Sequence, residues 1–334
     1  MSEAGNDDNT SALVSEAMPW IDSRLAEHGM TRTGSPGDPR VRPWATVISI
    51  PTDQGIVWFK AASPATAHEI GLYPLLIAEA PGLVLHPIAT DPARAWMLLP
   101  DGGISLRHAV PADAQDEYLL RIVPRYAQLQ RGMAKHVRAM LSIGVPDMQP
   151  HTMVDRFDEA IAAAEALARA SGALEDIDAI RRVAAVRSRF QSWSETVASF
   201  PIAASIDHSD LHANNMLLPE GIRGRARIYD WGDSVIAHPF STLLVMLRSL
   251  MDELQTTPND PRLARVRDAY LGSFADVAGH DELVEIAEAA CWTSVVTRAL
   301  VHVRIIDLTG SQDPYLASAP IAWMKTFLNA TWLE

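Results

Sequence analysis

Hydrophobic residues first follow a helical period near Pro19. Proline fits the first turn of a helix, so a helix is expected to begin there and to end at Gly29. The buried side of this helix is predicted to contain Trp20, Ile21 and Leu25. The residues before it are mostly polar, so residues 1–17 are predicted to be a disordered tail.

From Met30 to Asp101 the pattern changes to that of strands and turns. Residues 44–50 are rich in β-branched side chains, residues 56–60 form a mostly apolar run, and a turn containing Gly55 separates the two. This arrangement predicts a β-hairpin. The other elements expected here are a helix over residues 65–78 and strands over residues 83–88 and 95–99. Together they predict a small antiparallel sheet that carries one helix.

After a glycine hinge at residues 101–103, the apolar residues follow a helical period. One helix is predicted to bury Phe157, Ile161, Ala164 and Ala168 and to end at Gly172, and the next to bury Ile177, Ile180 and Ala184. Further helices are predicted over residues 242–254, 262–274, 282–306 and 320–333, with loops and short strands over residues 206–231. The predicted fold class is α+β, with a small β-rich lobe over residues 18–103 and a large helical lobe over residues 104–334.

Composition narrows the possible partners. The chain has 334 residues, of which 48% are hydrophobic, and a formal net charge of −13. Nucleic acids and anionic membranes require a basic face, so neither is expected as a partner. The single cysteine, Cys291, excludes a disulfide framework and a cysteine-rich zinc site. The N-terminus has no pattern of a signal peptide, and no uncharged apolar run approaches the roughly 18 residues of a membrane span, so a cytoplasmic location is expected.

The chemistry is concentrated in two segments. The first reads His-Ser-Asp-Leu-His-Ala-Asn-Asn over residues 208–215, and the second reads Ile-Tyr-Asp-Trp-Gly-Asp over residues 228–233. Phosphoryl transfer from a nucleotide needs a carboxylate to accept the proton of a hydroxyl group, oxygen ligands for magnesium, and cations near the phosphates. Asp210 can serve as the base, Asn215 and Asp230 can bind the metal, and His212 can contact phosphate oxygens.

Together these motifs resemble the catalytic and metal-binding loops of aminoglycoside phosphotransferases and related sugar, choline and homoserine kinases, whose fold is that of protein kinases. The resemblance implies a protein-kinase-like fold and a kinase that uses ATP, or GTP, with Mg²⁺. It implies that Asp210 is the catalytic base and that Asn215 and Asp230 bind the metal. His212 stands where protein kinases have a lysine that contacts the transferred phosphate.

The resemblance extends upstream. Lys60 ends an apolar strand, as the phosphate-binding lysine of kinases does, and Glu69 on the next helix is placed to pair with it. Residues 98–103, which include Leu99 and Asp101, correspond to the hinge beside the adenine. Strand alternation puts Trp58 on the same face as Lys60, so its indole is predicted to face the nucleotide.

Three features depart from the family pattern, and the first is Trp58, at a cleft position where kinases usually have a small residue. The hairpin has no Gly-x-Gly-x-x-Gly sequence, and only Gly34 and Gly37 lie near the expected phosphate-covering loop. The second acidic residue of the metal loop, Asp233, comes three positions after Asp230, whereas the family often has it two positions after. Asp233 is therefore a weaker candidate for the metal than Asp230.

Other functions fit parts of the same pattern. His208, Asp210 and His212 alternate as the ligands of a metal-dependent hydrolase do, although His208 also fits a structural role in the loop. A nucleotide-binding pseudokinase would explain the missing glycines and the bulky Trp58, although Trp58 and Trp231 also fit a plain core. A kinase that acts on proteins is disfavoured, because the short spacing between Asp230 and the next helix leaves no room for a long activation segment.

The charge of the helical lobe bears on the acceptor. Residues 239–334 contain 12 Asp and Glu against 7 Lys and Arg, a formal net charge of −5. Carboxylates that can meet ammonium groups are Asp252, Glu253, Glu285, Glu288 and Asp307, and Trp292 is placed to stack on a sugar ring. This field favours a neutral or cationic acceptor, such as a sugar, amino sugar or aminoglycoside.

Overall fold

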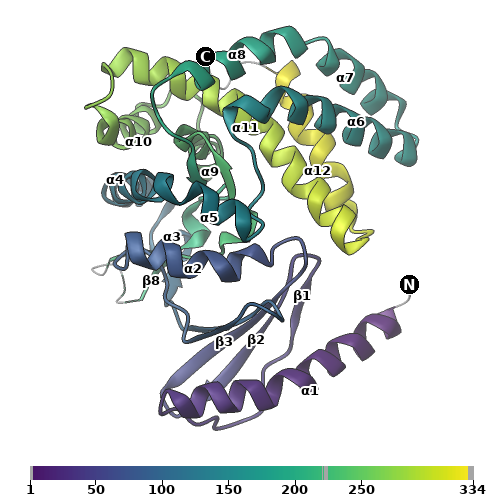
Figure 1. Cartoon of the computed structure of the whole chain (residues 1–334), viewed down its shortest axis with the longest axis vertical. Coiled ribbons are helices and arrows are strands. Elements are labelled where there is room, and N and C mark those ends of the chain that lie inside the picture. The colour runs from purple at the N-terminus through teal and green to yellow at the C-terminus, as the bar shows by residue number, and fades with distance from the viewer. Residues whose placement is uncertain (1–2, 220, 222–224, 330–334) are drawn as a thin grey trace.

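The computed structural model describes residues 3–219, 221 and 225–329. It has two lobes, with a five-stranded sheet in the small lobe and a large helical lobe beside it (Figure 1). This arrangement confirms the predicted α+β fold class.

The sheet of the small lobe has the strand order β1-β2-β3-β5-β4, with antiparallel neighbours. Its strands are β1 (Arg40–Arg42), β2 (Ala45–Thr52), β3 (Gly55–Ala62), β4 (Ala89–Asp91) and β5 (Trp96–Pro100). The predicted hairpin is β2 and β3, in which Val47 pairs with Lys60. Trp58 pairs with Leu99 of β5. Paired residues lie on one face of a sheet, so this register fixes which side chains point toward the helical lobe.

Helix α1 (Glu3–Glu27) covers the other face of the sheet (Figure 1). It begins well before Pro19, so the prediction of a disordered tail is wrong for residues 3–17. Ala17, Ile21 and Leu25, four residues apart, are buried against the sheet. Pro19 itself is exposed. A proline inside a helix lowers the stability of the helix by about 3 kcal/mol. Burial of Ile21 and Leu25 offsets this loss, because each buried Ile or Leu side chain stabilises the fold by about 1.5–3 kcal/mol.

The strand predicted over residues 83–88 is not one of the strands of this sheet. After α2 (His68–Glu79), the Leu83 carbonyl accepts a hydrogen bond from the Ile228 N–H, and the Leu85 N–H donates to the Ile228 carbonyl. The start of this apolar run therefore pairs with β9 (Arg227–Ile228), and only Ile88 at its end bonds to β5, its N–H donating to the Leu98 carbonyl at 2.7 Å. The apolar pattern of residues 83–88 does not show which strand they pair with, because pairing in either lobe buries the same side chains.

The helical lobe contains more helices than the sequence pattern predicts individually. Its helices are α3 (Leu106–Ala109), α4 (Gln115–Met133), α5 (Val137–Ser142), α6 (Met153–Ser171), α7 (Leu174–Ala184), α8 (Arg187–Ser199), α9 (Leu243–Glu253), α10 (Pro261–Leu271), α11 (His280–Thr309) and α12 (Pro314–Lys325). Helix α12 begins earlier than predicted because Asp313 caps it, its side chain accepting a hydrogen bond from the Tyr315 N–H. The predicted end of this helix, at residues 330–333, lies outside the described residues.

Helix α11 crosses the middle of the helical lobe. Within the described part of the chain, it alone is long and apolar enough to cross a membrane by length and composition. However, 83% of its most apolar 18-residue stretch is buried inside the protein. Packing against α6, α8 and α12 accounts for that composition.

Short strands between the lobes hold the two chemically distinctive segments. They are β6 (Ile104–Ser105), β7 (Ser205–Asp207), β8 (Met216–Leu218), β9 (Arg227–Ile228) and β10 (Val235–Ala237). Strand β8 pairs with both β6 and β9, and β7 pairs with β10. The hinge crosses close to β8 at Gly103, which has a φ of +76° and where a Cβ would lie 2.5 Å from the Leu218 carbonyl oxygen. A glycine is therefore required at that crossing.

Candidate active site

Two loops of the helical lobe carry the residues singled out in the sequence. The first, residues 208–215, follows β7, and the second, residues 229–233, follows β9. Each contains one residue of positive φ near its start, Ser209 at 62° and Asp230 at 64°. Small polar side chains tolerate this left-handed conformation because they can form local hydrogen bonds. The two turns bring Asp210 and Asp230 to the wall of the same cavity.

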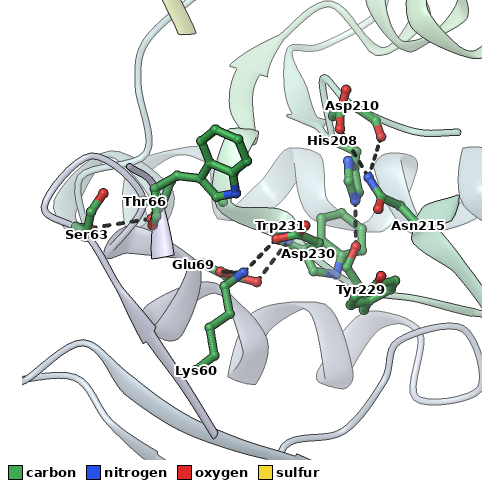
Figure 2. A network of polar contacts seen from close by, with 12 residues as sticks. Lys60, Ser63, Thr66, Glu69, His208, Asp210, Asn215, Tyr229, Asp230 and Trp231 are labelled. Carbon is green, nitrogen blue, oxygen red and sulfur yellow. Dashed lines mark hydrogen bonds and ion pairs between the residues drawn. The ribbon is translucent and has the colours of Figure 1, made fainter. Parts of the chain in front are cut away.

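His208 joins the two loops from inside the protein. Its Nε2 donates a hydrogen bond of 2.9 Å to the Tyr229 carbonyl (Figure 2), and its backbone N–H donates to the Tyr126 hydroxyl. The ring is fully buried, and burial lowers its pKa. His208 is thus engaged away from Asp210 and His212, and the described residues contain no cluster of three His, Cys, Asp or Glu that could hold a metal. This geometry argues against the hydrolase alternative.

Lys60 bridges the two lobes. Its Nζ lies 2.6 Å from Glu69 Oε2 and 2.6 Å from Asp230 Oδ1. Figure 2 shows both contacts as dashed lines. Glu69 is fully buried, and its other oxygen accepts a hydrogen bond of 3.0 Å from the Trp231 N–H. The predicted pairing of Lys60 with Glu69 is present, and it fixes the metal loop as well as the lysine.

Two opposing effects act on the charge of Lys60. Burial alone would lower its pKa, but the carboxylates of Asp230 and Glu69 outweigh it and hold the pKa of Lys60 above its ordinary value. Lys60 therefore stays protonated at neutral pH. The Asp230 side chain is 38% exposed, whereas Glu69 is not exposed at all, so only one of its partners is open to replacement.

Asp210 is held by three side chains. Asn215 Nδ2 donates to the Asp210 carbonyl at 2.8 Å and to its Oδ2 at 3.2 Å, and His212 Nε2 lies 3.2 Å from the same Oδ2. The Arg298 guanidinium lies 3.2 Å from Oδ1. Burial raises the pKa of Asp210, but the Arg298 guanidinium and then His212 lower it by more than burial raises it. The pKa of Asp210 therefore lies well below its usual range. The carboxylate is ionised and can accept a hydrogen bond from a hydroxyl group.

Sequence analysis missed Arg298. It lies in the middle of α11, is buried, and pairs with Asp233 at 3.0 Å as well as with Asp210. Asp233 is therefore engaged by a buried cation of the helical lobe. One turn and a half further along α11, Arg304 donates to the Gly232 carbonyl at 3.3 Å. A buried arginine in an apolar helix is the signal that could have drawn attention to this position.

A cavity of about 370 Å³ lies between the sheet and the helical lobe. Four of the predicted nucleotide-binding residues line it, namely Trp58, Lys60, Leu99 and Asp101. The fifth, Glu69, is absent from this wall because it lies behind Lys60. Gly34 and Gly37 also do not line the cavity, and the Gly37 N–H instead donates to the Ser49 carbonyl of β2.

A second cavity of about 240 Å³ adjoins the first and shares Trp44, Lys60 and Asp230 with it. The rest of its wall comes from Thr66, from the two loops through Asp210, His212, Gly232 and Asp233, and from α11 and α12 through Arg298, His302, Ile305, Tyr315 and Leu316.

The residues of the helical lobe that sequence analysis assigned to the acceptor lie elsewhere. None of Asp252, Glu253, Glu285, Glu288 and Asp307 lines the second cavity. Trp292 is buried and stacks on Trp193 at 4.9 Å between ring centroids, so it is not placed to meet a sugar.

Two residues have oxygens that suit a magnesium ion: Asp230, which lines both cavities, and Asn215, which lines neither cavity and is bonded to Asp210. Asp230 uses Oδ1 for Lys60, and its Oδ2 has no hydrogen bond or ion pair within the described part of the chain. Asn215 uses its amide nitrogen for Asp210, which leaves the amide oxygen as its remaining polar atom. Magnesium prefers hard oxygen ligands and takes only one or two from the protein when substrate phosphates supply the others.

Solved structures of small-molecule phosphotransferases share this fold. The chain is similar to a type I macrolide 2′-phosphotransferase, with a TM-score of 0.58 and 13% identity over 92% of this chain and 96% of that one. An ethanolamine kinase of Plasmodium vivax has a TM-score of 0.60 and 13% identity, over 89% and 82%. The GDP complex of aminoglycoside 2′-phosphotransferase-IIIa has a TM-score of 0.56 and 16% identity, over 89% and 93%.

No family model matches the sequence, and a search of curated proteins found no match. At such low sequence identity the structural similarity shows the fold. It confirms, at that level, the predicted resemblance to aminoglycoside phosphotransferases and their relatives.

Proposed function

We propose that this protein is a small-molecule kinase that transfers the γ-phosphate of ATP, or of GTP, to a hydroxyl group. The observation that carries the proposal is that Asp210, Asp230 and Lys60 line the second cavity together, with Asn215 bonded to Asp210 and Glu69 paired with Lys60. The three solved phosphotransferases of the same fold support it, and one of them binds GDP.

The base is Asp210. It is ionised because Arg298 and His212 lower its pKa, so it can accept the proton of an acceptor hydroxyl in the second cavity. The Asn215 amide, which bonds both its backbone and its carboxylate, fixes the direction of that carboxylate. Holding the hydroxyl for in-line attack accounts for much of the rate in such transfers.

Lys60 neutralises phosphate charge. Its partner Asp230 lies at the cavity wall, so a phosphate oxygen can replace one ion pair while Glu69 retains the other. Magnesium bound at Asp230 and Asn215 would neutralise the negative charge that develops on the phosphates. Leu99 and Trp58 pair two residues along the sheet from Lys60 and line the first cavity with Asp101, which suits the base of the nucleotide.

The acceptor is a small neutral or cationic molecule with a hydroxyl group. Each buried cation at the second cavity is already shared between two carboxylates, Lys60 by Glu69 and Asp230, and Arg298 by Asp210 and Asp233. Among the described residues of this wall, the pairing leaves no unpaired lysine or arginine for an anionic acceptor. The volume of about 240 Å³ is below the range of roughly 300–1,000 Å³ typical of drug-sized ligands, which favours a single sugar, amino sugar or amino alcohol over a many-ringed antibiotic.

The test is a panel of acceptors matched in size and differing in charge. Sugars, amino sugars, amino alcohols, aminoglycosides and sugar phosphates are each incubated with ATP or GTP and magnesium, and nucleoside diphosphate is measured. Faster turnover with a neutral or cationic acceptor supports the proposal. A highest kcat/KM with an anionic acceptor contradicts the acceptor class. Nucleotide binding without turnover for any acceptor indicates a pseudokinase, and turnover that requires zinc indicates a hydrolase.

A further inference from the structure

The hairpin of β1 and β2, which would cover the nucleotide, contains no glycine. Strands β1 and β2 are joined by a turn of only two residues, Pro43 and Trp44. The Trp44 carbonyl accepts hydrogen bonds from the Thr66 hydroxyl at 2.6 Å and from the Ser63 N–H at 2.9 Å, so the turn is tied to the start of α2. This tight and tethered turn cannot wrap phosphates in backbone N–H groups as a glycine-rich loop does. Other donors must face the phosphates.

Two arginines of β1 lie on the same face as Lys60. Arg40 pairs with Val47 and Val47 pairs with Lys60, so these three side chains form one row across the sheet. Arg42 lies two residues further along β1, in the row of Ala45. Both arginines line the first cavity together with Lys60. Since strands are about 4.8 Å apart, Arg40 stands about 10 Å from Lys60 across the sheet, a gap that a phosphate chain can bridge.

Both arginines are exposed and free of carboxylates. Arg40 and Arg42 make no ion pair within the described ranges, and the guanidinium of Arg40 lies 5.0 Å from the ring centroid of Trp58. Most arginines elsewhere in the described chain are paired with Asp or Glu or bonded to a carbonyl. Guanidinium groups present a fixed fork of donors that matches phosphate oxygens, so two unpaired ones on a cavity wall favour an anionic ligand.

We propose that Arg40 and Arg42 form a guanidinium clamp on the phosphates of the nucleotide and take the place of a glycine-rich loop. The inference rests on the proposed kinase function and goes beyond it by assigning the phosphate contacts. The order of the rows assigns each arginine a position. The hinge residue Leu99 is level with Trp58, Lys60 is level with Arg40, and Arg42 lies beyond them, next to the turn. Arg40 therefore contacts the phosphates nearer the nucleoside, and Arg42 contacts the terminal one.

The experiment is calorimetric titration of the full chain with adenosine, ADP and ATP in the presence of magnesium and without acceptor. The variants are Arg40→Gln and Arg42→Gln. Each loses charge-assisted hydrogen bonds, so affinity is expected to fall about 10- to 100-fold. Arg40→Gln should weaken ADP and ATP alike, and Arg42→Gln should weaken ATP more than ADP. Adenosine binding should stay as in wild type, because adenosine carries no phosphate.

Arg94→Gln is the matched control. Arg94 also belongs to the small lobe and lies over a tryptophan, 4.4 Å from the Trp96 ring centroid, but this ring belongs to the cluster beneath α1 on the opposite face of the sheet. Its variant should bind all three ligands as wild type does.

Several results would overturn the clamp. The clamp would be overturned, and the kinase proposal left intact, if both β1 variants bound ATP within about twofold of the wild-type affinity. A change of that size is the scale of a weak surface ion pair. A loss of adenosine binding equal to the loss of ATP binding would mean that the arginines support the cavity rather than the phosphates. A wild-type protein that binds neither ADP nor ATP would overturn both proposals.

Discussion

The two lobes each contribute one buried cation to the candidate active site, and both cations lie between two carboxylates. Lys60 of the sheet lies 2.6 Å from Glu69 and 2.6 Å from Asp230. Arg298 of α11 lies 3.2 Å from Asp210 and 3.0 Å from Asp233. A buried charge without a partner is strongly unfavourable, so neither cation would be stable there alone.

The Lys60 and Arg298 clusters differ in which carboxylate can give up its contact with the cation. Glu69 is fully enclosed and Asp230 is at the cavity wall, so Lys60 has one permanent and one replaceable partner. Both partners of Arg298 line the second cavity, with side chains 29% and 23% exposed, and the arginine itself is 6% exposed. We infer that the lysine serves the nucleotide, whereas the arginine sets the charge of the base. The following predictions separate these roles.

The largest effect is expected for Asp210→Asn. Asparagine has a similar shape but cannot accept the proton of the acceptor, so kcat should fall about 10²- to 10⁴-fold, the usual contribution of general base catalysis. Nucleotide affinity, measured by calorimetry, should change little. Asp233→Asn is the matched control, because it removes the other carboxylate of Arg298 without removing the base. Equal losses of kcat in the two variants would contradict the base assignment.

Glu69→Ala tests the permanent partner of Lys60. Removing one member of a buried ion pair typically costs about 3–5 kcal/mol, and it also removes the acceptor of the Trp231 N–H. The free energy of unfolding, measured with urea, should fall by that amount. Asp230→Ala, at the exposed partner, should cost clearly less stability. The two partners would be equivalent, contrary to our account, if both variants were destabilised equally.

Asp230→Ala should instead remove the magnesium dependence of nucleotide binding. In the proposed function its carboxylate is the anionic oxygen ligand of the metal, and Asn215 is neutral. In calorimetry, wild type should bind ATP more tightly with magnesium than with EDTA, and the variant should bind equally under both conditions. A magnesium effect of wild-type size in the variant would rule out the metal role of Asp230.

Arg298→Met tests the cation of the helical lobe through pH. In wild type the pKa of Asp210 is well below its usual range, so the base stays ionised and kcat/KM should be flat as pH falls from 7 to 5. Without the guanidinium, burial is the largest remaining influence and raises the pKa. The variant should therefore lose kcat/KM progressively on acidification. Parallel pH profiles would show that Arg298 does not control the base.

The smallest effect is expected for Trp58→Ala. Trp58 lines the first cavity near the hinge, so its truncation should change the affinity for ATP, or the preference between ATP and GTP, by about 0.5–1.5 kcal/mol, as for the loss of an aromatic contact. Thermal unfolding is measured in parallel. A variant that melts earlier and binds both nucleotides as before would show that the indole only supports the lobe.

The sequence predicted the Lys60 cluster and missed most of the Arg298 cluster for a physical reason. Lys60 lies near the end of β3 and Glu69 lies in the first turn of α2, so local periodicity and a family motif were enough to pair them. Arg298 lies in a long apolar helix, and only tertiary packing of α11 brings it to the catalytic loop. For the same reason, the sequence around Asp233 does not indicate that Asp233 pairs with Arg298.

The errors in the fold have a similar origin. The helix expected to begin near Pro19 extends back to Glu3, and on the turns just before Pro19 it packs Ala17, Val14 and Leu13 against the sheet, which propensity alone does not include. The run at residues 83–88 is apolar enough for a strand, but it pairs with Ile228 in the helical lobe. The lobes, the hairpin and the two loops were predictable because each has its own local pattern.

The central claim is that phosphate passes from nucleotide to an acceptor hydroxyl. The direct measurement is ³¹P NMR of a reaction containing the full chain, ATP, magnesium and the best acceptor from the panel, with Asp210→Asn in parallel. We predict one phosphate ester of the acceptor for each ADP formed by wild type, and no ester with the variant. Inorganic phosphate in place of the ester, or ester formation by both proteins at the same rate, would contradict the account.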